Sequence, residues 1–161
     1  MGTVTNVVFV GLGGQGVLTA SDILAQAAFV AGYDVKKSEL HGMAQRGGSV
    51  TSDLRYGERV YSPMISLGEA DYVVVLDTTQ LDFASCWKKP SGVVISPGLA
   101  DGLPLPNKRS MNVALLGLLT HYLALPLEAI EDAIMSHLKP ELHTESLGLF
   151  RSMTDKARSL S

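Results

Sequence analysis

The chain has 161 residues, of which 46% are hydrophobic, and its 13 basic and 16 acidic side chains give a net charge of −3. This length suits one globular domain with its own core, so residues 1–161 are expected to form a single domain. The slightly acidic balance argues against a nucleic-acid partner held by general attraction to phosphates. Cys86 is the only cysteine, so the chain cannot form an internal disulfide or supply an iron–sulfur or zinc site by itself.

The N-terminal region does not have the pattern of an export signal. It lacks the basic start and long apolar core of a signal peptide, and the apolar stretch over residues 113–119 is too short to cross a bilayer. We therefore expect a cytoplasmic protein without a membrane partner, which an unpaired cysteine also fits.

The first part of the chain predicts a strand, a helix and a second strand. Residues 4–10 are apolar and β-branched, as in a buried parallel strand. Apolar residues recur at helical spacing from 17 to 28, and Gly32 stands where that helix should end. Residues 33–38 then predict a second strand, so residues 4–38 are expected to form one βαβ unit.

The rest of the chain predicts three more extended segments and several helices. Residues 49–61 predict an extended segment or a hairpin with a turn at Tyr56-Gly57. Residues 72–76 and 92–96 predict strands, separated by a helix over 78–87 that Asp77 or Thr78 caps. A proline-containing loop over 97–111 follows, and helices are expected over 112–123, from Pro126, and over 143–158. This order predicts an α/β fold: a three-layer sandwich with a mostly parallel Rossmann-like sheet, a hairpin or extended insertion, and C-terminal helices.

A glycine-rich turn separates the first strand from the first helix. Its spacing, G-x-G-x-x-G, lets the backbone turn tightly and approach a bound group, and the free N–H groups of a helix start favour an anion. A dinucleotide site also expects an acid after the second strand, where only Glu39 is available. Three interpretations stay open: close packing or a subunit contact, a phosphate or other anion, and a dinucleotide. The candidate cofactor-binding residues are Gly11, Gly13, Gly14, Gln15 and Gly16.

A second glycine-rich segment follows the second predicted strand. Its glycines indicate unusual φ values or the close approach of a partner backbone. Arg46 has a planar, permanently charged group suited to a carboxylate or phosphate, whereas His41 has no evident carboxylate partner and is expected to be structural or interfacial. Both glycine-rich segments should lie at the C-terminal edge of the sheet, where ligands and partners usually bind. The candidate interface or active-site loop comprises His41, Gly42, Met43, Gln45, Arg46, Gly47 and Gly48.

The remaining polar residues do not predict a second site. The histidines lack the spacing of metal ligands, so no metal site is expected, and no residue is assigned a catalytic role. Asp77 is interpreted as a helix cap or a polar group at the sheet edge. Cys86, beside Trp87, is expected to be a partly buried small hydrophobe rather than a nucleophile.

The two glycine-rich segments resemble those of one known family. The turn Gly11-Leu12-Gly13-Gly14-Gln15-Gly16-Val17 is similar to that of the gamma subunit or domain of 2-oxoacid:ferredoxin oxidoreductases. The segment over residues 39–48 resembles the small beta subunit of indolepyruvate ferredoxin oxidoreductase in particular. The resemblance continues through Arg55-x-Gly57, residues 60–63 and Gly68-Glu69-Ala70-Asp71, and fades after about residue 120.

This resemblance implies an accessory subunit of an enzyme that oxidatively decarboxylates a 2-oxoacid of the arylpyruvate, indolepyruvate or a related type. In that family coenzyme A takes the acyl group and ferredoxin takes the electrons. Thiamine diphosphate, magnesium and iron–sulfur clusters are then expected on the partner, a catalytic large subunit, and no cofactor on this chain alone. The isolated chain is expected to be inactive, to expose an apolar patch and to self-associate.

The glycine turn by itself leaves two alternatives. The first is a free-standing module that binds a nucleotide or coenzyme A. The second is an NAD-dependent dehydrogenase, against which the poorly placed ribose-binding acid and the lack of a histidine–carboxylate pair both argue.

Overall fold

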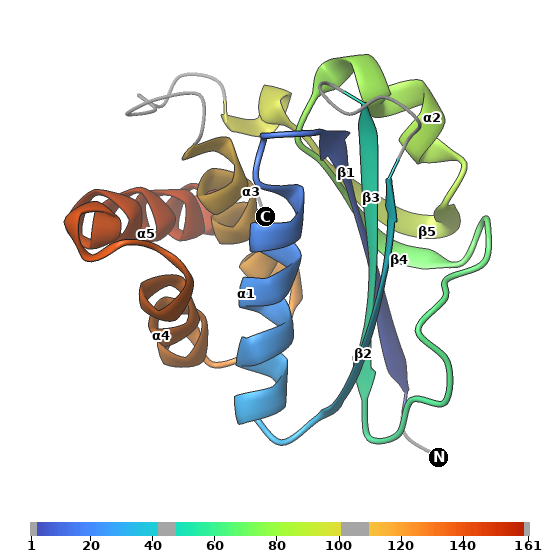
Figure 1. Ribbon diagram of the computed structural model, residues 1–161, viewed down its shortest axis with the longest axis horizontal. Helices are drawn as coiled ribbons and strands as arrows, with labels where there is room; N and C mark the ends of the chain where they lie inside the picture. The colour runs from blue at the N-terminus through green and yellow to red at the C-terminus, as the bar shows by residue number, and fades with distance from the viewer. Residues whose placement is uncertain (1–2, 42–47, 101–109, 160–161) are drawn as a thin grey trace.

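A mixed sheet of five strands, in the order β2-β3-β1-β4-β5, forms the centre of the fold (Figure 1). The computed structural model describes residues 3–41, 48–100 and 110–159. β1 pairs in parallel with β4, and β4 with β5, whereas β3 runs antiparallel to both β1 and β2. Four strands therefore point one way and β3 points the other. The strands are β1 (Val4–Leu12), β2 (Asp34–His41), β3 (Ser49–Gly57), β4 (Ala70–Val75) and β5 (Lys88–Ile95).

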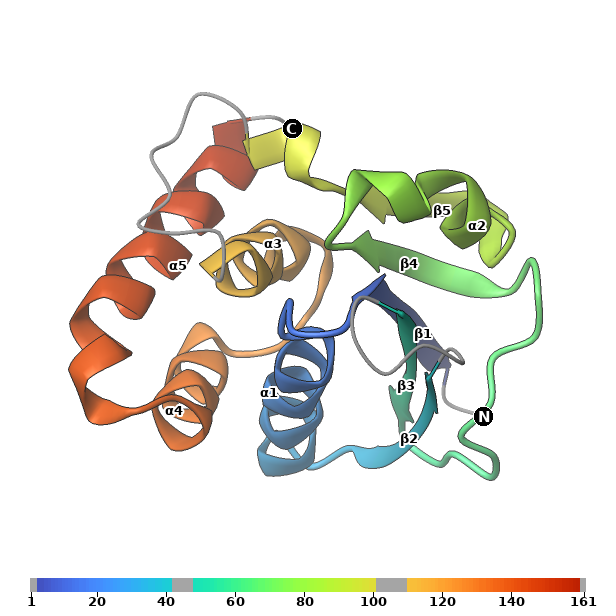
Figure 2. The same cartoon turned by 45° about the horizontal axis from the view of Figure 1, so that its top comes forward.

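Helices cover both faces of this sheet, which confirms the predicted α/β sandwich. Four of them lie on one face and the short α2 lies on the other (Figures 1 and 2). The four are α1 (Val17–Val30), α3 (Met111–Leu119), α4 (Leu127–His137) and α5 (His143–Ser159), and α2 is Leu81–Ser85. Short 3-10 turns span Thr78–Gln80, Pro97–Ala100, Thr120–Tyr122 and Pro140–Leu142. Of the helices in the described ranges, none combines the length and apolar character that a membrane span requires.

The apolar run of β1 is explained by the two cores it serves. Val7 and Phe9 belong to the large cluster under the four helices, whereas Val8 and Val10 belong to the smaller cluster under α2. Successive side chains of a strand point to opposite faces, so a strand buried on both sides has no polar positions. The four side chains are fully buried.

The βαβ unit expected over residues 4–38 is present, with one strand inserted into it, but the turn expected at Tyr56-Gly57 is not. β3 lies between β1 and β2, so residues 4–38 form a βαβ unit that is split by an intervening strand. Tyr56-Gly57 does not make a turn, because residues 49–57 form one strand, as the extended alternative predicted. This strand is held between β1 and β2 by Leu54 and Tyr56, which enter the large core, and by a buried hydrogen bond of 2.9 Å from Ser52 to Ser21 of α1.

The segment over residues 58–69 crosses the other face without regular structure, and strand side chains hold it in place. Asp34, Asp53 and Arg55 bond backbone groups of residues 60, 65 and 62, at 2.8, 3.0 and 2.7 Å. The segment leaves three large apolar side chains facing solvent: Tyr61, Met64 and Leu67, which are 84%, 68% and 66% exposed.

Candidate functional site

The glycine turn and the two described ends of the second glycine-rich segment, His41 and Gly48, lie at one edge of the sheet, as predicted. Gly11 of β1 and His41 of β2 are both register partners of Val50, on either side of β3. The N–H of Gly13 donates a hydrogen bond of 2.9 Å to the carbonyl of Gly48, which joins the two segments directly. We call Gly11–Gly16 with Gly48 the glycine edge. The predicted loop residues Gly42, Met43, Gln45, Arg46 and Gly47 lie outside the described residues, as does the side chain of His41.

Packing accounts for two of the glycines. A Cβ on Gly11 would lie 2.8 Å from Cγ2 of Val17 and 3.1 Å from Cβ of Leu76. Gly16 caps α1 with φ 83°, and a Cβ there would lie 2.4 Å from Nδ2 of Asn112. Real Cβ atoms are essentially never as close to a neighbour as 2.8 or 2.4 Å, so Gly11 and Gly16 admit no side chain unless a neighbouring atom moves.

Gly14 is different, because space around it is open. Its φ of 88° favours glycine, yet no atom of the described residues lies within 4 Å of a Cβ built on it. Gly13 and Gly14 are both exposed. The glycine edge therefore offers bare backbone to solvent at Gly13 and Gly14, between two glycines that packing requires.

Gln15 cross-links the glycine edge to the end of β4. Its Oε1 accepts a hydrogen bond of 2.8 Å from the N–H of Leu12, and its Nε2 donates one of 2.7 Å to Oδ2 of Asp77. Asp77 also caps the following 3-10 turn, because its Oδ1 accepts from the N–H of Thr79 at 3.0 Å. Hydrogen bonds from Thr79 and Gln15 lower the pKa of the Asp77 carboxyl. The predicted role of Asp77 as a cap is confirmed; sequence reasoning misses its bond to Gln15, because the two lie 62 positions apart.

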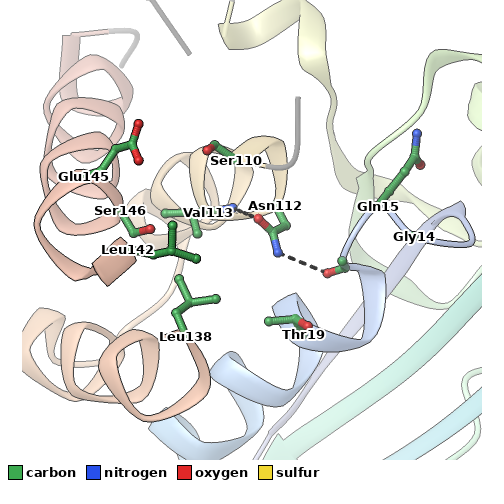
Figure 3. A pocket seen from close by; sticks show the side chains of 11 residues that line it. Gly14, Gln15, Thr19, Ser110, Asn112, Val113, Leu138, Leu142, Glu145 and Ser146 are labelled. Carbon is green, nitrogen blue, oxygen red and sulfur yellow. Dashed lines mark hydrogen bonds between the residues drawn. The ribbon is translucent and has the colours of Figure 1, made fainter. Parts of the chain in front are cut away.

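A cavity of about 330 Å³ lies behind the turn, between the N-terminal ends of α1, α3 and α5 (Figure 3). Asn112 spans it on one side, donating to the carbonyl of Gly16 at 3.4 Å and accepting from the N–H of Val113 at 2.8 Å. A second hollow, of about 390 Å³, lies on the β3 side of the turn. The first is lined by Gly14, Gln15, Gly16, Thr19, Ser110, Asn112, Val113, Leu138, Leu142, Glu145 and Ser146.

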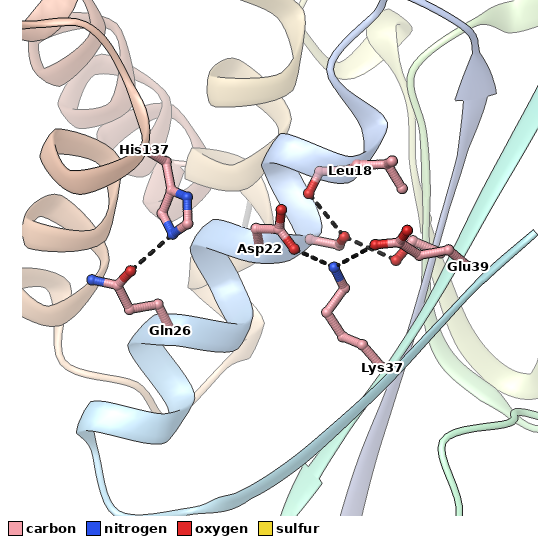
Figure 4. A network of polar contacts seen from close by, with 8 residues as sticks. Leu18, Asp22, Gln26, Lys37, Glu39 and His137 are labelled. Carbon is pink, nitrogen blue, oxygen red and sulfur yellow. Dashed lines mark hydrogen bonds and ion pairs between the residues drawn. The ribbon is translucent and has the colours of Figure 1, made fainter.

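Glu39, the only acid available for a ribose, is already engaged. It forms an ion pair of 2.9 Å with Lys37, which also binds Asp22 of α1 (Figure 4). Burial of the Lys37 amine opposes its charge, but the hydrogen bonds to Asp22 and Glu39 outweigh it and raise the pKa of Lys37. This ion-pair group ties β2 to α1, which weakens the dinucleotide interpretation of the turn.

Two further expectations concern metals and the cysteine. Among residues 3–41, 48–100 and 110–159, no three histidine, cysteine or acidic side chains are grouped as a metal site would require. The expectation that Cys86 is partly buried is wrong, because the residue is exposed. It lies just after the C-terminal end of α2, a helix too short to cover its thiol.

Comparison with solved structures identifies the class of fold. The chain superposes on the gamma subunit of keto/oxoacid ferredoxin oxidoreductase from Geobacter sulfurreducens with a TM-score of 0.79 and 23% identity. The match covers 96% of this chain and 99% of that one. Residues 6–104 match the family model described as pyruvate ferredoxin/flavodoxin oxidoreductase. The chain therefore belongs to that family, which confirms the resemblance drawn from the two glycine-rich segments.

Two curated relatives are similar over different lengths. "Indolepyruvate oxidoreductase subunit IorB" of Thermococcus kodakarensis is 42% identical over 91 residues, which are 56% of this chain and 45% of that relative. "Pyruvate/ketoisovalerate oxidoreductases common subunit gamma" of Pyrococcus furiosus is 29% identical over 174 aligned positions, covering 92% of this chain and 94% of that relative. The matched part of the chain thus spans a little under half the length of the IorB relative.

Proposed function

We propose that this chain is the accessory small subunit of a thiamine-diphosphate-dependent 2-oxoacid:ferredoxin oxidoreductase, acting on an arylpyruvate, indolepyruvate or a related acid. The hydrogen bond from Gly13 to Gly48 is the observation that carries this proposal. It joins the turn that resembles the family's gamma subunit to Gly48, the last residue of the segment that resembles the small beta subunit. The catalytic large subunit is the partner that docks there.

In this proposal the chemistry belongs to the partner. Thiamine diphosphate, magnesium and the iron–sulfur clusters are held by the large subunit, and coenzyme A and ferredoxin meet the assembled complex. The chain has one cysteine, so it could not hold a cluster by its own thiolates. Membership of the oxidoreductase family favours this role over a free-standing nucleotide or coenzyme A module.

This chain is expected to contribute a surface that fits the partner and backbone N–H groups that donate hydrogen bonds to it. Exposed glycines let a partner backbone come close, since no side chain stands in the way. The N–H groups at the start of α1, which no side chain of the described residues caps, would donate to carbonyl or carboxylate oxygens of the partner. The two hollows beside the turn provide room for partner side chains on either side of it.

The test is co-expression with the catalytic large subunit, comparing Gly14→Asn with Gly32→Asn. Both glycines have positive φ and open space around a Cβ, at opposite ends of α1, and asparagine tolerates that conformation better than most residues. Both variants should fold alike. Gly14→Asn should weaken co-purification and turnover of the 2-oxoacid, whereas Gly32→Asn should leave both unchanged. If the wild-type chain does not associate with the large subunit, or decarboxylation proceeds equally well without it, the proposal is wrong.

A further inference from the structure

The glycine turn has little intrinsic stiffness and depends on neighbouring side chains for its shape. Gly14 and Gly16 both have positive φ, and no side chain of the described residues caps the start of α1. Glycine loses more conformational freedom on folding than any other residue. Within the described part of the chain, the side-chain hydrogen bonds that reach the turn come from Gln15 and Asn112.

Gln15 is the residue that connects the turn to a second strand. The parallel pairing of β1 and β4 is extended by a bond of 2.8 Å from the N–H of Leu76 to the carbonyl of Val10. Gln15 continues this connection beyond the strands, since it bonds Leu12 on one side and Asp77 on the other. Its side chain points away from α3 and α5 (Figure 3).

The bridge needs an amide at this position. One atom of the side chain must accept from the N–H of Leu12 while another donates to a carboxylate. The terminal amide of Gln15 does both, whereas a carboxylate at this position would only accept and an ammonium would only donate. A bond to an ionised partner is also stronger than one between neutral groups.

We infer that Gln15 is a positioning residue of the docking surface: through its bridge from Leu12 to Asp77, it fixes the orientation in which Gly13 and Gly14 are presented to the large subunit. This inference rests on the proposed function. It assigns Gln15 a role through the backbone it holds, and it requires no contact between the Gln15 side chain and the partner.

The chain offers a swap that tests the bridge. In Gln15→Glu, two carboxylates face each other and the donor is lost; in Asp77→Asn, the new amide cannot both cap Thr79 and accept from Gln15. In the double variant, the carboxylate introduced at position 15 accepts from Leu12 and from the new amide at position 77. The oxygen of that amide still accepts from Thr79, so every donor again has an acceptor. Net charge is the same in the double variant as in the wild type.

Gln80→Glu is the matched control for the added charge. It places the same charge near Asp77, at a half-buried residue whose side chain bonds Thr79 and, among the described residues, forms no hydrogen bond with the turn. A change that appears in Gln15→Glu and not in this control therefore comes from the bridge and not from charge alone.

The measurement is backbone amide exchange by NMR on the full chain, together with association with the large subunit, under conditions where circular dichroism shows every variant folded. Each single variant should exchange the Leu12 amide about two- to tenfold faster, as expected for loss of a hydrogen bond between neutral groups. Each should also bind the large subunit more weakly. The double variant should recover both properties, and Gln80→Glu should change neither.

The outcomes separate the inference from the proposed function. Unchanged exchange in Gln15→Glu, or no recovery in the double variant, would overturn the bridge. If exchange follows the swap while association does not, the bridge is structural only and the positioning role is lost. If the wild type itself fails to associate, the proposed function falls, and the exchange pattern still decides whether Gln15 holds the turn.

Discussion

Gly16→Ala should destabilise the chain more than Gly14→Ala, although both glycines have nearly the same φ. The two share a backbone penalty, because an L-residue in the left-handed region costs about 1–2 kcal/mol. Only the Gly16 variant also meets a neighbour, since its Cβ would lie 2.4 Å from Nδ2 of Asn112. Asn112 must then rotate and give up its bonds to Gly16 and Val113, which adds about 0.5–1.5 kcal/mol for each bond lost.

These terms sum to roughly 2–5 kcal/mol for Gly16→Ala and about 1–2 kcal/mol for Gly14→Ala. Urea unfolding followed by circular dichroism measures both free energies. The double variant Gly16→Ala/Asn112→Ala removes the clash but keeps the backbone strain. It should therefore be less destabilised than the two single variants added together, by about 1 kcal/mol or more. Equal losses for the two glycine variants, or strictly additive effects in the double variant, would refute the steric part of this reasoning.

Three other predictions concern packing and titration. Gly117→Ala should destabilise the chain by about 1–3 kcal/mol, because its Cβ would lie 2.6 Å from Cβ of Met153 in α5. Gly148→Ala should instead stabilise it by about 0.5–1 kcal/mol, because no described atom lies close to a Cβ there, and urea unfolding measures both changes. Burial raises the pKa of Tyr56 to about 12, so in an ultraviolet absorbance titration its step should come late and disappear in Tyr56→Phe. Burial also raises the pKa of the Asp53 carboxyl, although a backbone hydrogen bond opposes the shift. The folded state then binds the proton more tightly than the unfolded state, so the wild type should gain stability relative to Asp53→Asn as the pH falls through the raised pKa toward 3.8. A difference in unfolding free energy that does not change with pH would contradict this.

Local patterns were sufficient to predict most elements, but not the strand order. The apolar run of β1, the helical spacing of α1 and the stop at Gly32 are properties of neighbouring residues, and the structure has all three. Whether β2 pairs with β1 or leaves a gap depends on what enters between them. A crossover helix of ordinary length permits either arrangement, and β3 fills the gap through contacts that lie far along the chain, such as Ser52 with Ser21.

The same limit applies to the candidate site. Strand direction predicted that the two glycine-rich segments would share an edge, because parallel strands end together. The bond between Gly13 and Gly48 and the bridge from Gln15 to Asp77 depend on side-chain and loop placement, which no local pattern encodes. The sequence did contain one signal. Gln15 is a polar residue among glycines, and the phosphate-binding fingerprint G-x-G-x-x-G does not specify the residue at that position.

The structure divides the glycine fingerprint by physical cause. Gly11 and Gly16 are required by what lies beside them, so their presence in the motif says little about a ligand. Gly14 is required by its φ alone, and an asparagine would meet much of that need. No atom of the described residues fills the space beside this glycine. Under the proposed function the large subunit occupies that space, and the bridging amide of Gln15 keeps the turn in position to receive it.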